Sequence, residues 1–131
     1  MTVFESKINI AKPVNEVYSF LSDFNNHKTL MPNSISNWSS TNNEASFTVQ
    51  NMANLSLKIS NRIENSTIII TPSGQVPFNV DMRWVVVDLG NNSTEAVLTL
   101  SAELNMMMKV MASGPLQKLV EHQTAALQKV V

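Results

Sequence analysis

Hydrophobic and polar residues alternate along most of the first 104 positions, with the period of a half-buried β-strand. The alternation predicts one strand over residues 3–11 and about six more between residues 33 and 104. Short turn signals such as Asn42-Asn43 and Gly90-Asn91 separate the later segments. Because short turns join antiparallel neighbours, we expect these strands to form an antiparallel sheet.

The last part of the chain has the spacing of a long amphipathic helix, predicted from Pro115 to Val131. Its inner stripe is predicted to consist of Leu116, Leu119, Val120, Gln123, Leu127 and Val130. Gly114 and Pro115 interrupt the approach to this helix, so residues 105–113, which contain four methionines, are predicted to form a mobile flap.

Two short helices are predicted between the first strand and the second, over residues 13–22 and 23–31. Pro13 suits the first turn of a helix because its missing N–H is not needed there. Ser22 or Asp23 can cap the second helix, and Pro32 ends it.

A sheet with one apolar face and a helix with one apolar stripe must bury these surfaces against each other. We expect a curved sheet to close incompletely around the helix and to leave a cavity, since broad and adaptable side chains are frequent on the predicted inner faces. The residues predicted to line it are Phe47, Met82, Trp84, Met107, Met111, Leu119 and Val120, with Tyr18, Asn61 and Gln123 orienting a polar end of the ligand.

These residues also have structural interpretations, which the sequence leaves open. Methionines are ordinary core filler, and Trp84 is interpreted first as a core anchor rather than a stacking platform. Asn61 and Asp88 can lie near strand ends in water, and Gln123 can lie at the flank of the helix.

Composition excludes several classes of function. The 131 residues carry a net charge of −1, so no basic field is available to hold nucleic acid. Without cysteine, disulfides and thiolate chemistry are excluded. The N-terminus lacks the apolar core of a secretory signal, and no stretch approaches the ~20 apolar residues of a membrane span. A cytoplasmic protein of one domain, residues 1–131, is therefore expected.

Catalytic signals are weak. An acid–base enzyme needs a titratable group inside its pocket, and the candidates here are Asp88 and His27. Strand parity predicts that Asp88 points inward, whereas the Asn-rich surroundings of His27 favour a surface position, with the cavity mouth as the alternative. No metal-binding motif or glycine-rich loop is present, so no metal or cofactor is predicted.

The order of elements and the residues around the first helices resemble the START-like, or helix-grip, superfamily, which is also known as SRPBCC and includes polyketide cyclase/dehydrase and lipid-transport proteins. The segments that carry the resemblance are IAKPVNEVY at 10–18, LSDF at 21–24, LMP at 30–32, Ile35, Trp38 and SGPL at 113–116. The resemblance implies an α+β fold in which a curved seven-stranded antiparallel sheet surrounds a long C-terminal helix, with two short helices between strands 1 and 2.

A binding role follows as the leading functional hypothesis. The resemblance implies a cavity for a small hydrophobic molecule, such as a lipid, an isoprenoid or a polyketide-like ring system, between the sheet and the C-terminal helix. A cyclase- or dehydratase-like enzyme and a protein-interaction module are the alternatives, and the sequence leaves a homodimer open.

Overall fold

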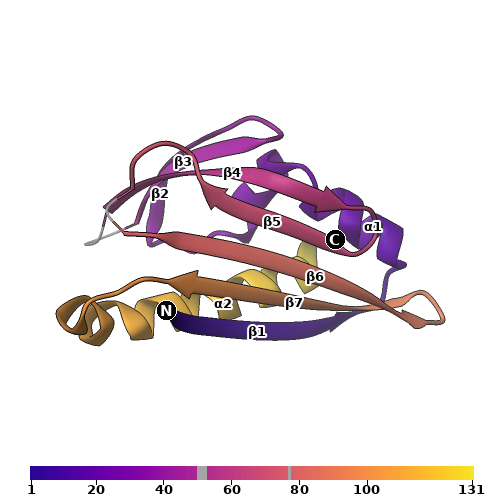
Figure 1. Ribbon diagram of the computed structural model, residues 1–131. Coiled ribbons are helices and arrows are strands. Elements are labelled where there is room, and N and C mark those ends of the chain that lie inside the picture. Colours follow the sequence, from indigo (N-terminus) through magenta and orange to yellow (C-terminus); the bar gives the residue numbers. More distant parts are fainter. Residues whose placement is uncertain (50–52, 77) are drawn as a thin grey trace.

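Over residues 1–49, 53–76 and 78–131, which the computed structural model describes, the chain forms a seven-stranded antiparallel sheet, two short helices and one long helix (Figure 1). In chain order the elements are β1 (Thr2–Ile10), α1 (Val14–Leu21), η1 (Phe24–Leu30), β2 (Ile35–Ser40), β3 (Glu44–Val49), β4 (Ala53–Ile63), β5 (Thr67–Pro72), β6 (Val80–Gly90), β7 (Ser93–Ala102) and α2 (Met106–Val130).

The strand order is β1-β7-β6-β5-β4-β3-β2, so β2 to β7 form a meander and β1 pairs with the last strand. The connection from β1 to β2 therefore crosses from one edge of the sheet to the other, and α1 and η1 make that crossing. The sheet is curved, and α2 runs behind its lower strands in Figure 1. This architecture confirms the predicted α+β, helix-grip fold.

The core lies between the concave face of the sheet and α2. Alternate residues of β6 and β7 point into it, as the period-two pattern predicts. From β7 these are Thr94, Ala96, Leu98, Leu100 and Ala102. From α2, the residues Ala112, Leu116, Val120, Gln123, Thr124 and Leu127 are buried. The helix packs against β1, β7 and η1.

Both short helices begin where the sequence predicts. Pro13 is the N-cap of α1, and the Asp23 side chain caps η1 by accepting a hydrogen bond from the backbone N–H of Asn25 at 3.0 Å. The second helix is a 3₁₀-helix. This tight connection carries the chain from β1 to β2.

The start of the long helix is the main error of the sequence prediction. Residues 106–113 are not a flap: α2 begins at Met106, where Asn105 Oδ1 caps the backbone N–H of Met108 at 2.8 Å. Gly114 and Pro115 lie inside the helix. The cap stabilises a start well before the proline, and Pro115 removes only one interior hydrogen bond.

A β-bulge in β4 reverses the alternation near its end. The pairing with β5 shifts between Ile59 and Asn61, so one extra residue switches the faces on which the following side chains lie. As a result Asn61 is exposed, contrary to the prediction that it faces the cavity, and Ile63 is half exposed.

The same bulge turns Arg62 toward the junction of α1 and η1. Its Nε donates to Ser22 Oγ at 2.9 Å and to the Ser22 carbonyl at 3.1 Å, and its Nη2 donates to the carbonyls of Ser22 at 2.8 Å and Asn42 at 3.1 Å. One guanidinium thus ties the end of α1 to the sheet.

We expect Arg62→Met to lower the free energy of unfolding by about 2 kcal/mol, because carbonyls next to a helix end lose a charged donor. Urea denaturation measures this. Arg83→Met is the matched control, since Arg83 is exposed on the outer face of the sheet. Equal losses for the two variants would contradict the structural role of Arg62.

Candidate functional site

An apolar cavity lies between the concave face of the sheet and α2. Ten hydrophobic side chains from four strands, the loop before β6 and the helix enclose it: Phe47, Val49, Leu55, Leu57, Phe78, Val80, Met82, Leu100, Leu116 and Leu119. Its volume is about 20 Å³, which is close to the space of one water molecule. The unliganded cavity is therefore nearly closed.

Three of the predicted residues, Phe47, Met82 and Leu119, line this cavity. Three more, Trp84, Val120 and Gln123, are fully buried in the core and are not among the residues that line the cavity. The structure thus brings six predicted side chains into the interior, and their role in binding stays a prediction.

The other predicted residues lie elsewhere. Met107 and Met111 are 73% and 67% exposed, so the expectation that they line the cavity is wrong. They occupy the first turns of α2, whose outer side faces solvent. Tyr18 is half-buried against the core and does not line the cavity.

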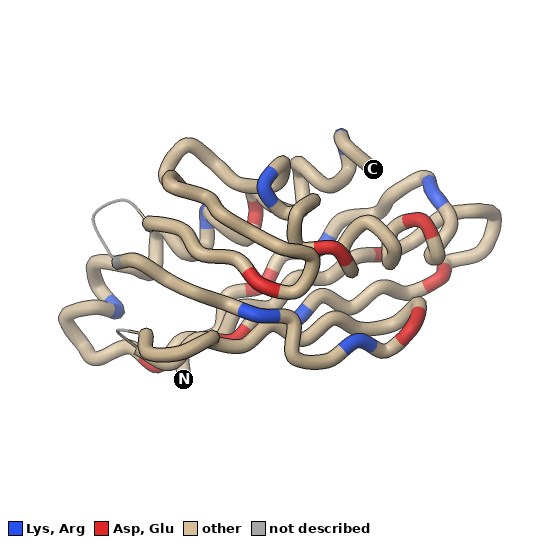
Figure 2. Tube along the Cα trace, turned by 90° about the horizontal axis from the view of Figure 1, so that it is seen from above, with Lys and Arg blue, Asp and Glu red and all other residues tan. Residues whose placement is uncertain are grey.

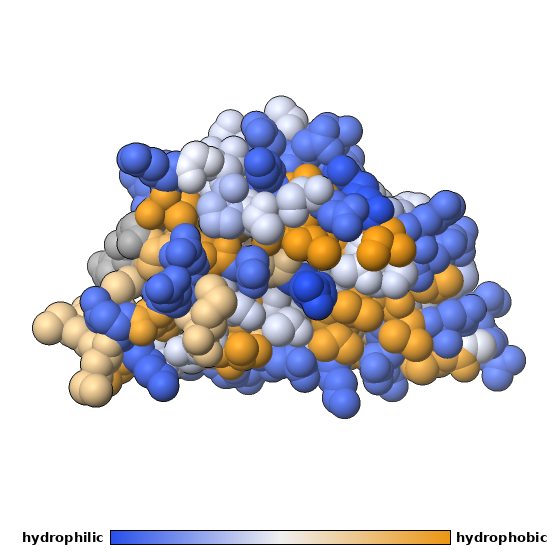
Figure 3. Space-filling model, in the orientation of Figure 1, coloured by the Kyte–Doolittle hydropathy of each residue, from blue (hydrophilic) through white to orange (hydrophobic). Residues whose placement is uncertain are grey.

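Exposed apolar side chains gather at the start of α2. Met106 and Val110 are 84% and 81% exposed, next to the two methionines just named. Moderately hydrophobic side chains project from the molecule at this end, at the lower left of Figure 3. The first two turns of the helix therefore make fewer contacts with the core than the rest of it.

Sequence reasoning missed most of the lining residues. Seven of them, Val49, Leu55, Leu57, Phe78, Val80, Leu100 and Leu116, were not among the predicted site residues. Strand parity had already placed the strand residues on the inner face. The prediction instead selected methionines because their side chains are adaptable, and so it included Met107 and Met111, which lie outside the cavity.

The cavity is next to an open groove on the surface. The groove has a volume of about 530 Å³, and its lining comes from Val76, Phe78, Asn79, Glu103, Leu104, Asn105 and Met108. Phe78 lines both spaces.

The two catalytic candidates do not meet in the cavity. Asp88 pairs in register with the buried Thr94, so its parity is that of the inner face, as predicted. It is nevertheless exposed, because the end of β6 extends past the core, and it does not line the cavity. Its Oδ1 accepts a hydrogen bond from the backbone N–H of Gly90 at 2.8 Å.

His27 is buried, with 1% of its surface exposed, contrary to the expected surface position. Its Nε2 lies 2.8 Å from the Leu21 carbonyl oxygen. Since a carbonyl only accepts, Nε2 carries the proton. Burial lowers the pKa of His27 to about 4, against the opposing effects of the Leu21 hydrogen bond and of Asp23. The ring also packs edge-on against Phe24, with centroids 4.8 Å apart.

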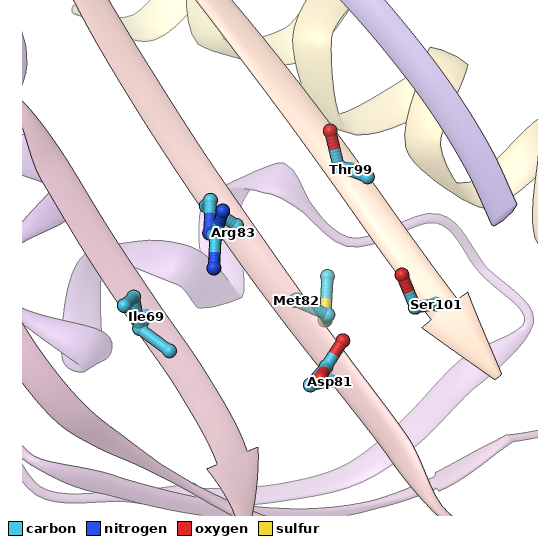
Figure 4. Close-up of a pocket in the computed structure, with 6 residues that line it drawn as sticks. All are labelled: Ile69, Asp81, Met82, Arg83, Thr99 and Ser101. Carbon is cyan, nitrogen blue, oxygen red and sulfur yellow. The ribbon is translucent and has the colours of Figure 1, made fainter.

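A second depression lies on the opposite, outer face of the sheet. It has a volume of about 210 Å³ and lies over β5, β6 and β7, where Figure 4 shows Ile69, Asp81, Met82, Arg83, Thr99 and Ser101. Most of these side chains are exposed or half-buried, so this is a shallow polar hollow. Acidic and basic residues are interspersed over the molecule in Figure 2, and the hollow carries one of each sign.

Within the described ranges, none of the helices is both long enough and apolar enough to cross a bilayer.

Several solved structures have a similar fold. A START superfamily protein from Mycobacterium smegmatis superimposes with a TM-score of 0.71 at 18% identity, covering 98% of this chain and 99% of that one. The protein XoxI from Bacillus cereus gives 0.77 at 12% identity, with coverages of 98% and 94%. A conserved protein from Geobacillus kaustophilus gives 0.69 at 16% identity, with coverages of 98% and 93%.

These likenesses extend over nearly the whole chain and show that it has the START-like, helix-grip fold. No protein-family model matches the sequence, and no curated protein is similar to it. The activity must therefore be argued from the cavity itself.

Proposed function

We propose that this protein binds or carries a small hydrophobic molecule in the cavity between the sheet and α2. The observation that supports it is the lining, in which all ten side chains are apolar and come from both layers of the fold. Ligand sites are concave and mostly apolar, and the START-like fold is compatible with small-molecule binding. A lipid, an isoprenoid or a polyketide-like ring system fits such a surface.

Binding requires the cavity to expand, because sites for such molecules have volumes of about 300–1,000 Å³. The start of α2 is the element best suited to move. Its first turns carry four exposed apolar side chains, and Pro115 removes the hydrogen bond that would reach the Met111 carbonyl. We propose that α2 bends at Gly114-Pro115, so that the segment before the bend, residues 106–113, moves away from the sheet and lets the cavity expand at the end lined by Leu116.

A substitution that fills the cavity tests this proposal. Leu119→Phe is expected to weaken binding of the neutral fluorescent probe N-phenyl-1-naphthylamine by at least about tenfold, because the larger side chain occupies the space that the probe needs. Leu119 is only half-buried, so the ring can be accommodated without loss of the fold. Fluorescence titration measures the affinity, and thermal melting checks the fold.

Leu89→Phe is the matched control, since Leu89 is 49% exposed and lies near the far end of β6. It is expected to bind the probe as the unmodified protein does. A probe that binds neither the unmodified protein nor the control, or that binds Leu119→Phe with undiminished affinity, would refute a ligand site beneath α2.

A further inference from the structure

Three buried polar atoms in the core have no hydrogen-bond partner among the described residues. They are Nε1 of Trp84 and both side-chain amide atoms of Gln123, Nε2 and Oε1. Both side chains are fully buried, with 0% of their surface exposed. Buried polar groups are satisfied in most proteins, so three unpaired atoms within one core indicate an absent partner.

Trp84 and Gln123 lie at the same level of the fold. Thr124, the neighbour of Gln123, has its Oγ1 2.7 Å from Ser6 Oγ on β1. Ser6 pairs with Leu98 on β7, and Leu98 pairs with Trp84 on β6. The turn of α2 that holds Gln123 therefore lies beside β1 in the same row of the sheet as Trp84, which is two strands, or about 10 Å, further across.

This level adjoins the apolar cavity. Leu100 of β7 and Met82 of β6 line the cavity and pair with each other. This pair lies two residues along the strands from the row that holds Trp84, a distance of about 6.6 Å. On the helix, Leu119 lines the cavity and lies one turn, about 6 Å, before Gln123. The unpaired atoms of Trp84 and Gln123 therefore lie one row of side chains beyond the apolar residues that line the cavity.

We infer that the indole N–H of Trp84 and the amide of Gln123 bind the polar end of the ligand, and that this end is a neutral hydroxyl or carbonyl group. The inference rests on the proposed function. Nε1 and Nε2 supply N–H donors that an oxygen can accept, and Oε1 can accept the proton of a hydroxyl.

Among the described residues, the core holds no charged side chain that could pair with an ionised end of the ligand. The buried polar residues of the described chain are His27, Thr94, Gln123 and Thr124, so no lysine or arginine is available in the core to pair with a carboxylate. No aspartate or glutamate is buried there to pair with an ammonium group either. An unpaired buried charge is far more costly than a neutral group that forms hydrogen bonds.

Three probes of equal chain length test the inference: 1-octanol, octanoate at pH 8, and octane. Titration of the methyl resonance of Met82, which lines the cavity, measures each affinity by NMR. Gln123→Met keeps the length of the side chain and removes both polar atoms. We expect the ratio of the octanol affinity to the octane affinity to fall about tenfold in this variant, and octanoate to bind at least tenfold more weakly than octanol to the unmodified protein.

Trp84→Phe is the second variant, because it removes the indole N–H from the opposite layer, and the same ratio is expected to fall in it. If both variants bind octanol and octane with unchanged relative affinity, the inference is overturned and the proposed function is supported. The partner of the three polar atoms is then a buried water. Octanoate binding as tightly as octanol would also overturn the inference. Absence of any Met82 shift with all three probes would refute the ligand site itself.

Discussion

Val120→Asp is expected to yield no folded protein. Val120 is fully buried on the inner stripe of α2, and aspartate would place a carboxylate among apolar side chains. The effective penalty for a buried unpaired charge is several kcal/mol, and the lost burial of valine adds about 1.5–3 kcal/mol. Together these approach the whole net stability of a domain, about 5–15 kcal/mol.

Val110→Asp is the matched control, because it makes the same change on the same helix at a side chain that is 81% exposed. It is expected to remain soluble and to unfold at an unchanged urea concentration. Circular dichroism and urea denaturation of both purified variants provide the comparison. A normal cooperative transition for Val120→Asp would show that α2 is not held against the sheet in solution.

The architecture was predictable because alternation and helical spacing report directly on which face is buried. β7 alternates without interruption, and Ala96, Leu98, Leu100 and Ala102 are buried as the alternation predicts. In the C-terminal half of α2, Leu116, Val120, Gln123 and Leu127 are buried where the spacing places them. Leu119 is half-buried, and the prediction that Val130 belongs to the inner stripe is wrong, because Val130 is 45% exposed at the end of the helix. Periodicity holds wherever an element is regular and packs against one partner.

Irregular positions limited the prediction of the site. A β-bulge leaves no clear trace in an alternating sequence, so Asn61 was assigned to the wrong face. At Asn61 parity was counted through a register shift that only the pairing of strands reveals. At Asp88 the parity holds, but β6 has already left the core, and the sequence does not show where the core ends.

The length of α2 was missed for a different reason. Gly114-Pro115 is a strong local signal for a helix break, yet the helix continues through it from Met106, nine residues before Pro115, where Asn105 caps the helix start. The same error affects the predicted position of the methionines. Residues 105–113 are predicted to form a mobile flap, whereas Met107 and Met111 lie on the outer side of α2.

Acidification is expected to destabilise the protein through His27. The folded state holds this ring neutral, with its pKa lowered to about 4 from 6.5, whereas the unfolded chain has the ordinary value. Between these two pH values the unfolded state binds more protons, so the free energy of unfolding falls as pH falls through this window and is fully retained only above about pH 6.5. From pH 7 to pH 5 the loss from this residue is about 2 kcal/mol.

His27→Gln isolates this contribution, because glutamine retains an N–H donor for the Leu21 carbonyl and does not titrate. Urea denaturation at pH 7 and pH 5 is expected to show about 2 kcal/mol less acid sensitivity in this variant than in the unmodified protein. His122→Gln makes the same change at an exposed histidine and retains His27, so the loss of about 2 kcal/mol that is assigned to His27 is expected to remain in it. If His27→Gln loses as much stability on acidification as the unmodified protein, then protonation of His27 is not the cause of the acid sensitivity, and the core around Phe24 must tolerate a charged ring.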